Sequence, residues 1–312
     1  MIGIQSIGTY IPTKRRDNLL RMSQFSVDEE FLKTKIGMLS LAIKDGSEET
    51  SDLCCSAFDD LIKKTDDIIV DDIDCIVVCT QNPDGNGLPH TSAIVHAKLG
   101  LPTSCAAFDV SLGCSGYVYS LSIIQGFMLA NGFKKGLLFT CDPYSKIIDN
   151  DDKNTSLLFG DAATVTLISE QPEWKTGKFL FGTQGAEGAA IKIQDNSHKL
   201  EMNGRGVFSF TATVMPKHIN DMLEMNNLTS DDIDLFALHQ GSRFIVDTLR
   251  KRLGVEENKV PFVAEKYGNT VSSSIPLMLS ELAEGKNKIV IAGFGVGLSW
   301  ASTVLYKVDK EI

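Results

Sequence analysis

The sequence lacks the features that would suit a membrane span or a nucleic-acid partner. No apolar run approaches the roughly 18 residues that cross a bilayer, so we expect no membrane span. The N-terminal MIGIQSIGTYIPTKRRDN carries its basic residues after the apolar stretch, the reverse of a signal peptide. Acidic residues outnumber basic ones by 40 to 30, giving a net charge of −10 and a pI near 5.0. Such a chain repels polyanions, so we expect no nucleic acid as a partner.

Cysteine pairing motifs are also missing. There is no CxxC pair, which argues against a zinc ribbon or a dithiol redox site. Most of the cysteines lie in apolar runs, where a thiol behaves as a small hydrophobe; the seven are Cys54, Cys55, Cys75, Cys79, Cys105, Cys114 and Cys141. We therefore expect a reducing, cytoplasmic location, no metal site and no resident cofactor.

What is present is enough apolar sequence for a large core. The chain has 312 residues, of which 43% are hydrophobic and 22% charged, with a mean hydropathy of +0.01. These values exclude a disordered, collagen-like or coiled-coil protein. The length predicts two domains or one large α/β unit.

Two segments of the chain repeat each other. DDIDCIVVCTQ begins at Asp71 and DDIDLFALHQG begins at Asp231, 160 positions later. Each reads as an acidic turn followed by a strand buried on both faces. An amphipathic helical stretch precedes each strand, and a helix ending in Leu-Gly follows it, at Gly100 and at Gly254. The repeat indicates a duplicated unit.

The repetition continues beyond these segments. In each half a further helix stops at a glycine and an apolar strand follows, after Gly132 and after Gly285. GDAATVTLIS (Gly160–Ser169) and WASTVLYKV (Trp300–Val308) read as the last strands of the two halves. The order in each half, strand–helix–strand–helix–strand, predicts an α/β fold with a parallel or mixed sheet covered by helices. We place the halves at residues 1–169 and 170–312.

Cys114 is the best candidate for a nucleophile. The strand CAAFDV leads into the turn SLGCSG and then into a long apolar helix, so Cys114 lies at a helix N-terminus. The free N–H groups there should stabilise a thiolate and lower the pKa of the thiol. Gly113 and Gly116 would let a substrate approach the backbone. Ser115 is the alternative nucleophile, but GCSG lacks the G-x-S-x-G spacing of a hydrolase.

His239 and Asn269 are the candidate partners of the cysteine. His239 ends the strand IDLFALHQG and should emerge at the carboxyl edge of the sheet, where ligand sites of α/β proteins gather. Asn269 lies in YGNTVSSSIPLML, the second half's counterpart of the cysteine turn and helix. Pseudo-twofold symmetry could bring both helix starts together. The three side chains would then offer a nucleophile and two hydrogen-bonding groups to a carbonyl.

A third site is the glycine-rich GFGVGLSW (Gly293–Trp300). A strand-like segment follows it rather than a helix, which disfavours a dinucleotide site. A tight turn that presents backbone N–H groups to an anion fits the pattern better.

Taken together, these motifs resemble the thiolase-superfamily condensing enzymes, most closely the 3-oxoacyl-[acyl-carrier-protein] synthase III family. The resemblance covers almost the whole chain and rests on FDVSLGCSGYVYSL, LLFGDAATVTLI, HQGSRFIVDTLRKRLG, YGNTVSSSIPLML and GFGVGLSWAS, in the family's order. It implies a thiolase-like fold in which two βαβαβ halves form a five-layered αβαβα core. It also implies a homodimer with a tunnel for a phosphopantetheine arm.

The resemblance also implies a mechanism. Cys114 would accept an acyl group from an acyl-coenzyme A or acyl-carrier-protein thioester. His239 and Asn269 would hold the carbonyl of malonyl carrier protein while carbon dioxide leaves, and the enolate would attack the acyl-Cys114 ester to give a 3-oxoacyl product. The backbone N–H groups of Cys114 and Val296 would form the oxyanion hole.

Several positions depart from the family pattern. Val296 stands where glycine is usual, and Phe31 where a tryptophan stacks on the adenine of coenzyme A. Lys35 and Lys153 stand where arginines grip the nucleotide, and lysine lacks their planar fork. Another arginine of the pattern aligns with Phe244, with Arg243 one position early. Leu88 replaces a phenylalanine that reaches across the dimer, which hints at a longer or branched acyl group.

An acidic enzyme still has to attract an acidic carrier protein, and Arg250, Lys251 and Arg252 form the obvious local basic patch. The main alternative to condensation is an acyltransferase of the same fold that moves an acyl group to an oxygen or nitrogen nucleophile without decarboxylation. Hydroxymethylglutaryl-coenzyme A synthase, a non-catalytic partner subunit and a cysteine hydrolase are further alternatives. The glutamate base of hydroxymethylglutaryl-coenzyme A synthase has no counterpart here. Non-catalytic partner subunits usually lack the cysteine, and the duplication disfavours a cysteine hydrolase.

Overall fold

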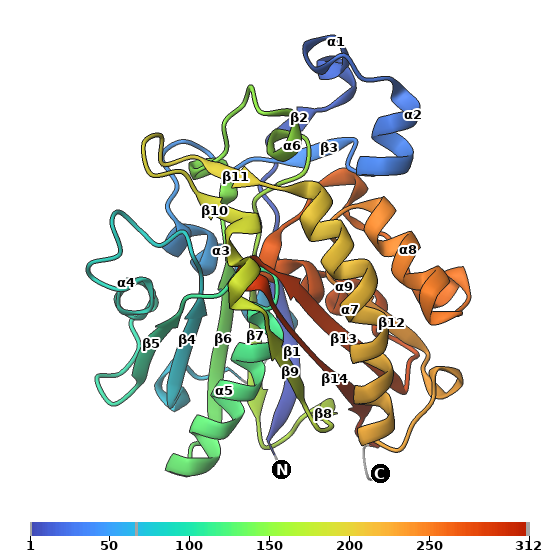
Figure 1. Ribbon diagram of the computed structural model, residues 1–312. Helices are drawn as coiled ribbons and strands as arrows, with labels where there is room; N and C mark the ends of the chain where they lie inside the picture. Colours follow the sequence, from blue (N-terminus) through green and yellow to red (C-terminus); the bar gives the residue numbers. More distant parts are fainter. Residues whose placement is uncertain (1, 66–67, 310–312) are drawn as a thin grey trace.

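The computed structural model describes residues 2–65 and 68–309 and has two related halves joined in one mixed β-sheet (Figure 1). The sheet order is β12-β13-β14-β8-β1-β7-β6-β4-β5, with β9 also paired to β14. The strands of the sheet are β1 (Gly3–Tyr10), β4 (Cys75–Cys79), β5 (Ala106–Val110), β6 (Lys135–Cys141), β7 (Ala163–Ser169), β8 (Trp174–Thr176), β9 (Leu180–Thr183), β12 (Leu235–Leu238), β13 (Lys288–Gly295) and β14 (Ser299–Lys307).

The helices follow the predicted order. The larger helices are α3 (Thr50–Lys64), α4 (Thr91–Leu99), α5 (Gly116–Asn131), α7 (Gly204–Met225), α8 (Arg243–Leu253) and α9 (Ser274–Leu282). Gly100, Gly132 and Gly254 cap α4, α5 and α8 in the left-handed conformation, as the Leu-Gly and Asn-Gly endings indicated.

The duplication is visible in strand pairing. In the first half β4 and β6 are parallel and β7 runs antiparallel to β6. In the second half β12 and β13 are parallel and β14 runs antiparallel to β13. Cys75 and Leu235, the first residues of β4 and β12, are the same 160 positions apart as the sequence repeat. The short strand β8, which pairs with both β1 and β14, connects the two sets of strands.

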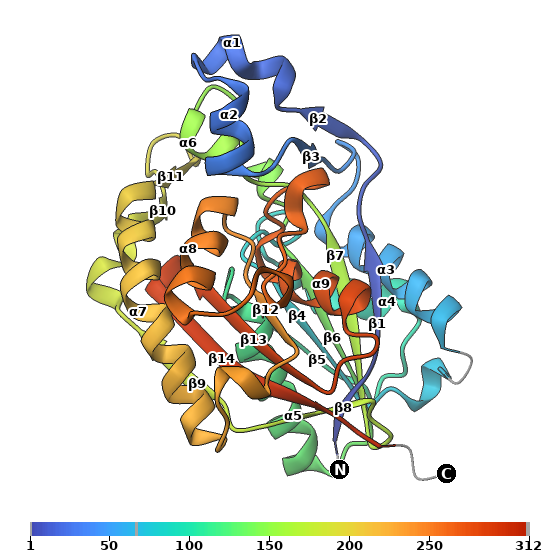
Figure 2. The same cartoon turned by 90° about the vertical axis from the view of Figure 1, so that its right-hand side faces the viewer.

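Packing of these elements gives five layers (Figures 1 and 2). Helices α5 and α9 form the middle layer, because their buried side chains share one apolar cluster with inward residues of β4, β6, β12 and β13. Helix α3 packs on the outer face of the first half, with Val95 of α4 beside it. Helices α7 and α8 cover the outer face of the second half. The order αβαβα and the thiolase-like architecture expected from the sequence are therefore confirmed.

One predicted strand does not form. The repeat predicts a strand in the second half between α8 and Asn269, as a counterpart of β5. All of residues 254–269 are described, and they hold only two short 3-10 turns, Glu257–Lys259 and Ala264–Lys266. Pro261 lies in the middle of this segment and removes a backbone donor that a strand would need.

Helix α5 is apolar around most of its circumference, but only some of its apolar side chains are buried. Tyr117, Val118, Leu121, Ile124 and Met128 are buried, whereas Ile123 is 39% exposed and Leu129 is 67% exposed. Helix α5 therefore has apolar side chains that are buried in the core and others that are exposed at the surface.

Several shorter strands and helices cover one end of the sheet. They are β2 (Arg15–Asp17), β3 (Ser40–Ala42), α1 (Met22–Phe25), α2 (Glu29–Phe31), α6 (Lys153–Ser156), β10 (Ile191–Ile193) and β11 (Leu200–Met202). A π-helical turn, Leu32–Ile36, extends α2 and supplies Lys35. In Figure 1 these shorter elements lie at the end opposite the two termini. Among residues 2–65 and 68–309, no helix is both long and apolar enough to cross a bilayer.

Candidate active site

Cys114 lies directly before the central helix, as predicted. Strand β5 ends at Val110, the chain turns, and Ser115 is the N-cap of α5. Cys114 is 5% exposed and Ser115 is 1% exposed. The Ser115 hydroxyl lies 2.6 Å from the Ser299 hydroxyl, in a buried pair. Cys114 lines a cavity of about 370 Å³, and Ser115 is not among the residues described as lining that cavity.

The pKa of the Cys114 thiol moves against the prediction. Burial raises this pKa to about 12, because a thiolate loses its hydration inside the protein. Hydrogen bonds from the backbone N–H groups of Cys114 and Val296 act in the opposite direction and are weaker than the burial effect. The expected stabilisation by N–H groups is present, but the resting cysteine is a neutral thiol. The same two N–H groups are the predicted oxyanion-hole donors.

The glycines around Cys114 have packing roles. A Cβ at position 295 would lie 2.9 Å from Sγ of Cys114, and one at position 116 would lie 2.4 Å from Sγ of Cys79. A Cβ at position 113 would lie 2.7 Å from Oε1 of Gln81. Gly113 and Gly116 therefore leave room for neighbouring protein side chains, and the expectation that a substrate approaches their backbone stays a prediction.

His239 follows β12 and is almost fully buried. Its Nδ1 lies 2.8 Å from the hydroxyl of Ser274, which itself donates to the backbone carbonyl of Val271 at 3.0 Å. The ring packs edge-on against Phe294, with centroids 5.5 Å apart. Burial lowers the pKa of His239 to about 3, so the imidazole is neutral near pH 7. The sequence did not single out Ser274, which fixes the ring.

Asn269 is oriented by the backbone of the same turn. Its Oδ1 accepts the N–H of Val271 at 2.9 Å. Its own N–H donates to the carbonyl of Leu158 at 2.8 Å, and its carbonyl accepts from Gly160 at 3.0 Å. Since Oδ1 is occupied, the Nδ2 group of Asn269 remains as the donor that faces the cavity.

One cavity of about 370 Å³ brings the three predicted catalytic residues together. Besides Cys114, His239 and Asn269, its lining includes four of the predicted substrate-binding residues, Phe31, Lys35, Lys153 and Phe244. The second half of the chain adds Arg205 and Phe208, which the sequence did not single out. They follow the β10–β11 hairpin, for which the repeat has no counterpart.

Aromatic rings and lysines are paired along the cavity wall. The Lys35 ammonium lies 3.9 Å from the ring centroid of Phe244, and that of Lys153 lies 5.0 Å from that of Phe31. Phe208 stacks on Phe244 with centroids 4.9 Å apart. The ammonium groups of both lysines therefore lie over aromatic rings in the cavity wall, at cation–π distance.

Other predicted residues lie outside this cavity. Arg243 is bound to Glu265 at 3.0 Å and lies over the ring of Phe262. Leu88 is 92% exposed on the loop before α4. Arg250, Lys251 and Arg252 occupy the last turn of α8, roughly 10 Å or more along the helix from its start beside the cavity.

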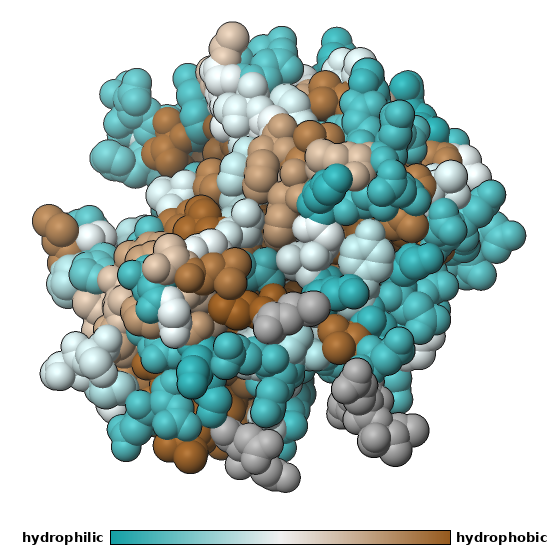
Figure 3. Space-filling view, turned by 90° about the horizontal axis from the view of Figure 1, so that it is seen from below, coloured by the Kyte–Doolittle hydropathy of each residue, from teal (hydrophilic) through white to brown (hydrophobic). Residues whose placement is uncertain are grey.

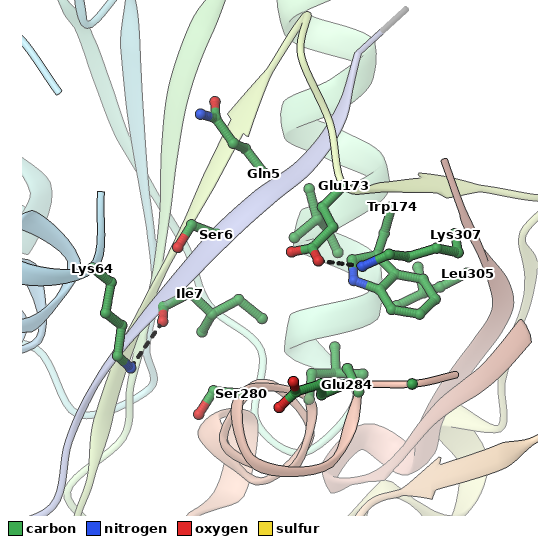
Figure 4. A pocket seen from close by; sticks show the side chains of 14 residues that line it. Gln5, Ser6, Ile7, Lys64, Glu173, Trp174, Ser280, Glu284, Leu305 and Lys307 are labelled. Carbon is green, nitrogen blue, oxygen red and sulfur yellow. Dashed lines mark hydrogen bonds and ion pairs between the residues drawn. The ribbon is translucent and has the colours of Figure 1, made fainter. Parts of the chain in front are cut away.

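A separate cavity of about 360 Å³ lies at the end of the molecule where the chain begins (Figure 4). Three of its four charged side chains are in ion pairs: Lys307 pairs with Glu173, and Lys64 pairs with Asp60 at 2.7 Å, while Glu284 is the fourth. Figure 3 shows this end of the protein, where hydrophilic side chains surround smaller apolar patches. This cavity shares no lining residue with the cysteine cavity and holds none of the predicted site residues.

Comparison with known proteins gives consistent matches. The family model described as 3-oxoacyl-[acyl-carrier-protein (ACP)] synthase III matches residues 108–187, and its C-terminal counterpart matches residues 223–307. The β-ketoacyl-[acyl-carrier-protein] synthase III of Caldanaerobacter subterraneus is 33% identical, with 97% of each chain covered. That of Staphylococcus aureus strain JH1 is 34% identical, covering 97% of this chain and 98% of that protein. The solved structure from Thermus thermophilus has a TM-score of 0.90 at 31% identity, covering 98% and 99% of the two chains.

Proposed function

Because this chain belongs to the 3-oxoacyl-[acyl-carrier-protein] synthase III family, we propose that Cys114, His239 and Asn269 carry out its reaction. The protein is an acyltransferase of the β-ketoacyl-[acyl-carrier-protein] synthase III type. The observation that carries the residue assignment is the single cavity that joins one thiol, one neutral imidazole and one free carboxamide N–H.

The first step is transfer of an acyl group to the cysteine. The thiol of Cys114 loses its proton and Sγ attacks the carbonyl carbon of an acyl thioester. The carbonyl oxygen becomes an oxyanion that accepts from the N–H groups of Cys114 and Val296. The carbon–sulfur bond of the donor then breaks, and the departing thiolate takes a proton. Charge develops on the oxyanion next to the two fixed donors, which compensates for the high pKa of the buried thiol.

The second step is condensation with malonyl carrier protein. The thioester oxygen of the malonyl group accepts from His239 and from Nδ2 of Asn269. This requires the imidazole proton on Nε2, so the single hydroxyl proton of Ser274 must turn from the carbonyl of Val271 to Nδ1 of His239 for this step. The carboxylate leaves as carbon dioxide, and its electron pair forms an enolate held by these donors. The enolate carbon attacks the acyl-Cys114 carbonyl, the carbon–sulfur bond breaks, and the Cys114 thiolate regains a proton.

Transfer to an oxygen or nitrogen nucleophile is the competing activity. This activity would need a base to take the proton of the incoming nucleophile. That base would be His239, the only imidazole among the residues described as lining the cavity. A condensation assay with 13C-carboxyl-labelled malonyl carrier protein separates the two. We expect labelled carbon dioxide and a 3-oxoacyl product in equal amounts. Product without release of label would favour acyl transfer.

The second substrate reaches the site as a carrier-bound arm. We propose that the acyl carrier protein docks on the face of α8 that carries Lys251 and Arg252, since both side chains are exposed on an otherwise acidic protein. The phosphopantetheine arm would then enter past Phe244, with Lys35 and Lys153 near its phosphate. Both coenzyme A and the carrier present the acyl donor on the same phosphopantetheine arm, so this route serves either donor.

We also propose that the protein is a homodimer formed through β5. This strand is the edge of the sheet, and all five of its residues are only half-buried. Phe108 of β5 packs on Phe127 of α5, and Ile123, one helical turn before Phe127, is exposed. An apolar edge strand beside an apolar helix face favours pairing with a second copy. Light scattering should give twice 34.0 kDa, and Phe108→Glu should give the monomer mass.

The seven cysteines are all free in the structure. Free thiols, including the reactive one, persist in a reducing compartment. We therefore propose that the enzyme works in the cytoplasm.

A further inference from the structure

A second cavity lies on the far side of the cysteine turn. It has a volume of about 300 Å³ and is lined by Gln81, Asn82, Ser111, Tyr144, Ile147, Ile191, Lys192, Ile193, Leu200 and Val296. Ile191 lines both this cavity and the one that holds Cys114. Cys114, Val296 and Tyr144 also belong to one apolar cluster. The second cavity is therefore placed where a group attached to Sγ of Cys114 could enter.

The wall of this cavity nearest to the cysteine is polar. The hydroxyl of Tyr144 donates to Oε1 of Gln81 at 3.2 Å. Both atoms lie against the cysteine turn, because a Cβ at position 113 would be 2.7 Å from Oε1 of Gln81 and 3.4 Å from the hydroxyl of Tyr144. The Nε2 group of Gln81 has no partner among the residues that the structure describes, so this pair still offers a donor.

The polar pair is held in a fixed position. The backbone N–H of Gln81 donates to Oδ1 of Asp142 at 3.1 Å, and Nδ2 of Asn82 donates to the same oxygen at 2.8 Å. Asp142 is 1% exposed, and its other oxygen has no partner among the described residues. The ring of Tyr144 packs against that of Phe159, with centroids 4.7 Å apart and planes tilted by 34°. A rigid hydrogen-bonding pair discriminates between ligands better than a mobile one.

We propose that this cavity selects a short acyl group that carries a hydroxyl substituent, and that Gln81 and Tyr144 are the residues that recognise it. This proposal rests on the proposed acyl-Cys114 intermediate. The hydroxyl oxygen accepts from Nε2 of Gln81 and its proton is donated to the oxygen of Tyr144. The carbon chain lies against Ile147, Leu200 and Val296. A plain acyl group of the same length offers the Gln81 donor no hydrogen-bond partner.

The test compares matched donors on the full-length enzyme. Butanoyl, 3-hydroxybutanoyl and 4-hydroxybutanoyl coenzyme A are offered separately, and the rate of Cys114 acylation is followed by intact mass. We expect at least one hydroxylated donor to acylate at least tenfold faster than butanoyl. In the double variant Gln81→Met/Tyr144→Phe, which keeps the side-chain volumes, this ratio should fall to about one.

The variants Gln81→Met and Tyr144→Phe alone, and Tyr10→Phe as a control, complete the design. Tyr10 donates its hydroxyl to Glu48 and lines neither cavity, so its variant should keep the wild-type ratio. Butanoyl acylating as fast as both hydroxylated donors in the wild type would overturn the inference and leave the acyl-Cys114 intermediate intact. The inference would also be overturned if the double variant kept the wild-type ratio of hydroxylated-donor to butanoyl acylation rates. Failure of every donor to acylate would instead contradict the proposed function itself.

Discussion

The backbone N–H of Val271 donates to Oδ1 of Asn269 at 2.9 Å. Val271 makes this hydrogen bond with a left-handed φ of 54°. A β-branched residue disfavours this conformation, and such strain is characteristic of functional sites. The carbonyl of the same residue accepts from Ser274, the hydroxyl beside His239. One strained peptide therefore orients both of the groups that we assign to enolate stabilisation.

The orientation of Asn269 can be tested by an isosteric change. Asn269→Asp keeps the oxygen that accepts from Val271 but replaces the free N–H donor with a carboxylate oxygen. We expect condensation with malonyl carrier protein to slow by about 100-fold, the usual effect of losing one oxyanion donor. Acylation of Cys114, measured by intact mass, should change less than threefold. A variant that loses both steps equally would show that Asn269 has a general structural role.

The space around Cys114 can be tested at Gly295. In Gly295→Ala the new Cβ would lie 2.8 Å from Cβ of Cys114 and 2.9 Å from Sγ, so the thiol must move away from its two N–H donors. We expect acylation to slow by 100-fold or more, while far-UV circular dichroism stays unchanged. Gly46→Ala is the matched control, because a Cβ at position 46 meets nothing within 4 Å. If Gly295→Ala were acylated as fast as the wild type, the result would contradict the assigned oxyanion hole.

The pH dependence of condensation follows from His239. Its pKa is lowered to about 3 by burial, so the imidazole is neutral at every pH well above that value and becomes charged only below it. With Cys114 already acylated, the rate of decarboxylation should therefore be flat between pH 5.5 and 8.5. A decline on the acid side with a midpoint near 6.5, the ordinary pKa of histidine, would show that the ring is hydrated and titrates in that range.

The basic face of α8 should affect only carrier-bound substrates. We expect Lys251→Glu/Arg252→Glu to raise the KM for malonyl carrier protein about tenfold and leave the KM for a small N-acetylcysteamine thioester unchanged, because only the carrier is acidic over a large surface. High salt should shrink the difference. The control is Lys63→Glu/Lys134→Glu, which reverses two exposed charges away from α8. Equal effects on both substrates would refute docking at this face.

The sequence predicted most of the candidate catalytic centre, because each of its residues has a local signal. A strand, a small-residue turn and an apolar helix mark Cys114; a strand end marks His239; and the repeat marks the turn of Asn269. The duplicated layers were predictable for the same reason. The strand missing before Asn269 was not, because one proline in an otherwise apolar segment decides against pairing.

Effects that depend on burial or on distant partners could not be read from the sequence. The pKa of Cys114 rises because the folded chain removes water from the thiol, which outweighs the nearby N–H groups. The Gln81–Tyr144 pair joins residues 63 positions apart on separate loops. Ser274 looks like any serine in a helix start until the fold places it beside His239.

The most direct test of the whole account is the mass of the protein after exposure to an acyl thioester and then to malonyl carrier protein. We predict that the wild type gains the mass of one acyl group, that Cys114→Ala gains none, and that malonyl carrier protein returns the wild type to its original mass as a 3-oxoacyl product appears. An acyl adduct that persists in Cys114→Ala, or one that malonyl carrier protein fails to discharge, would contradict the account.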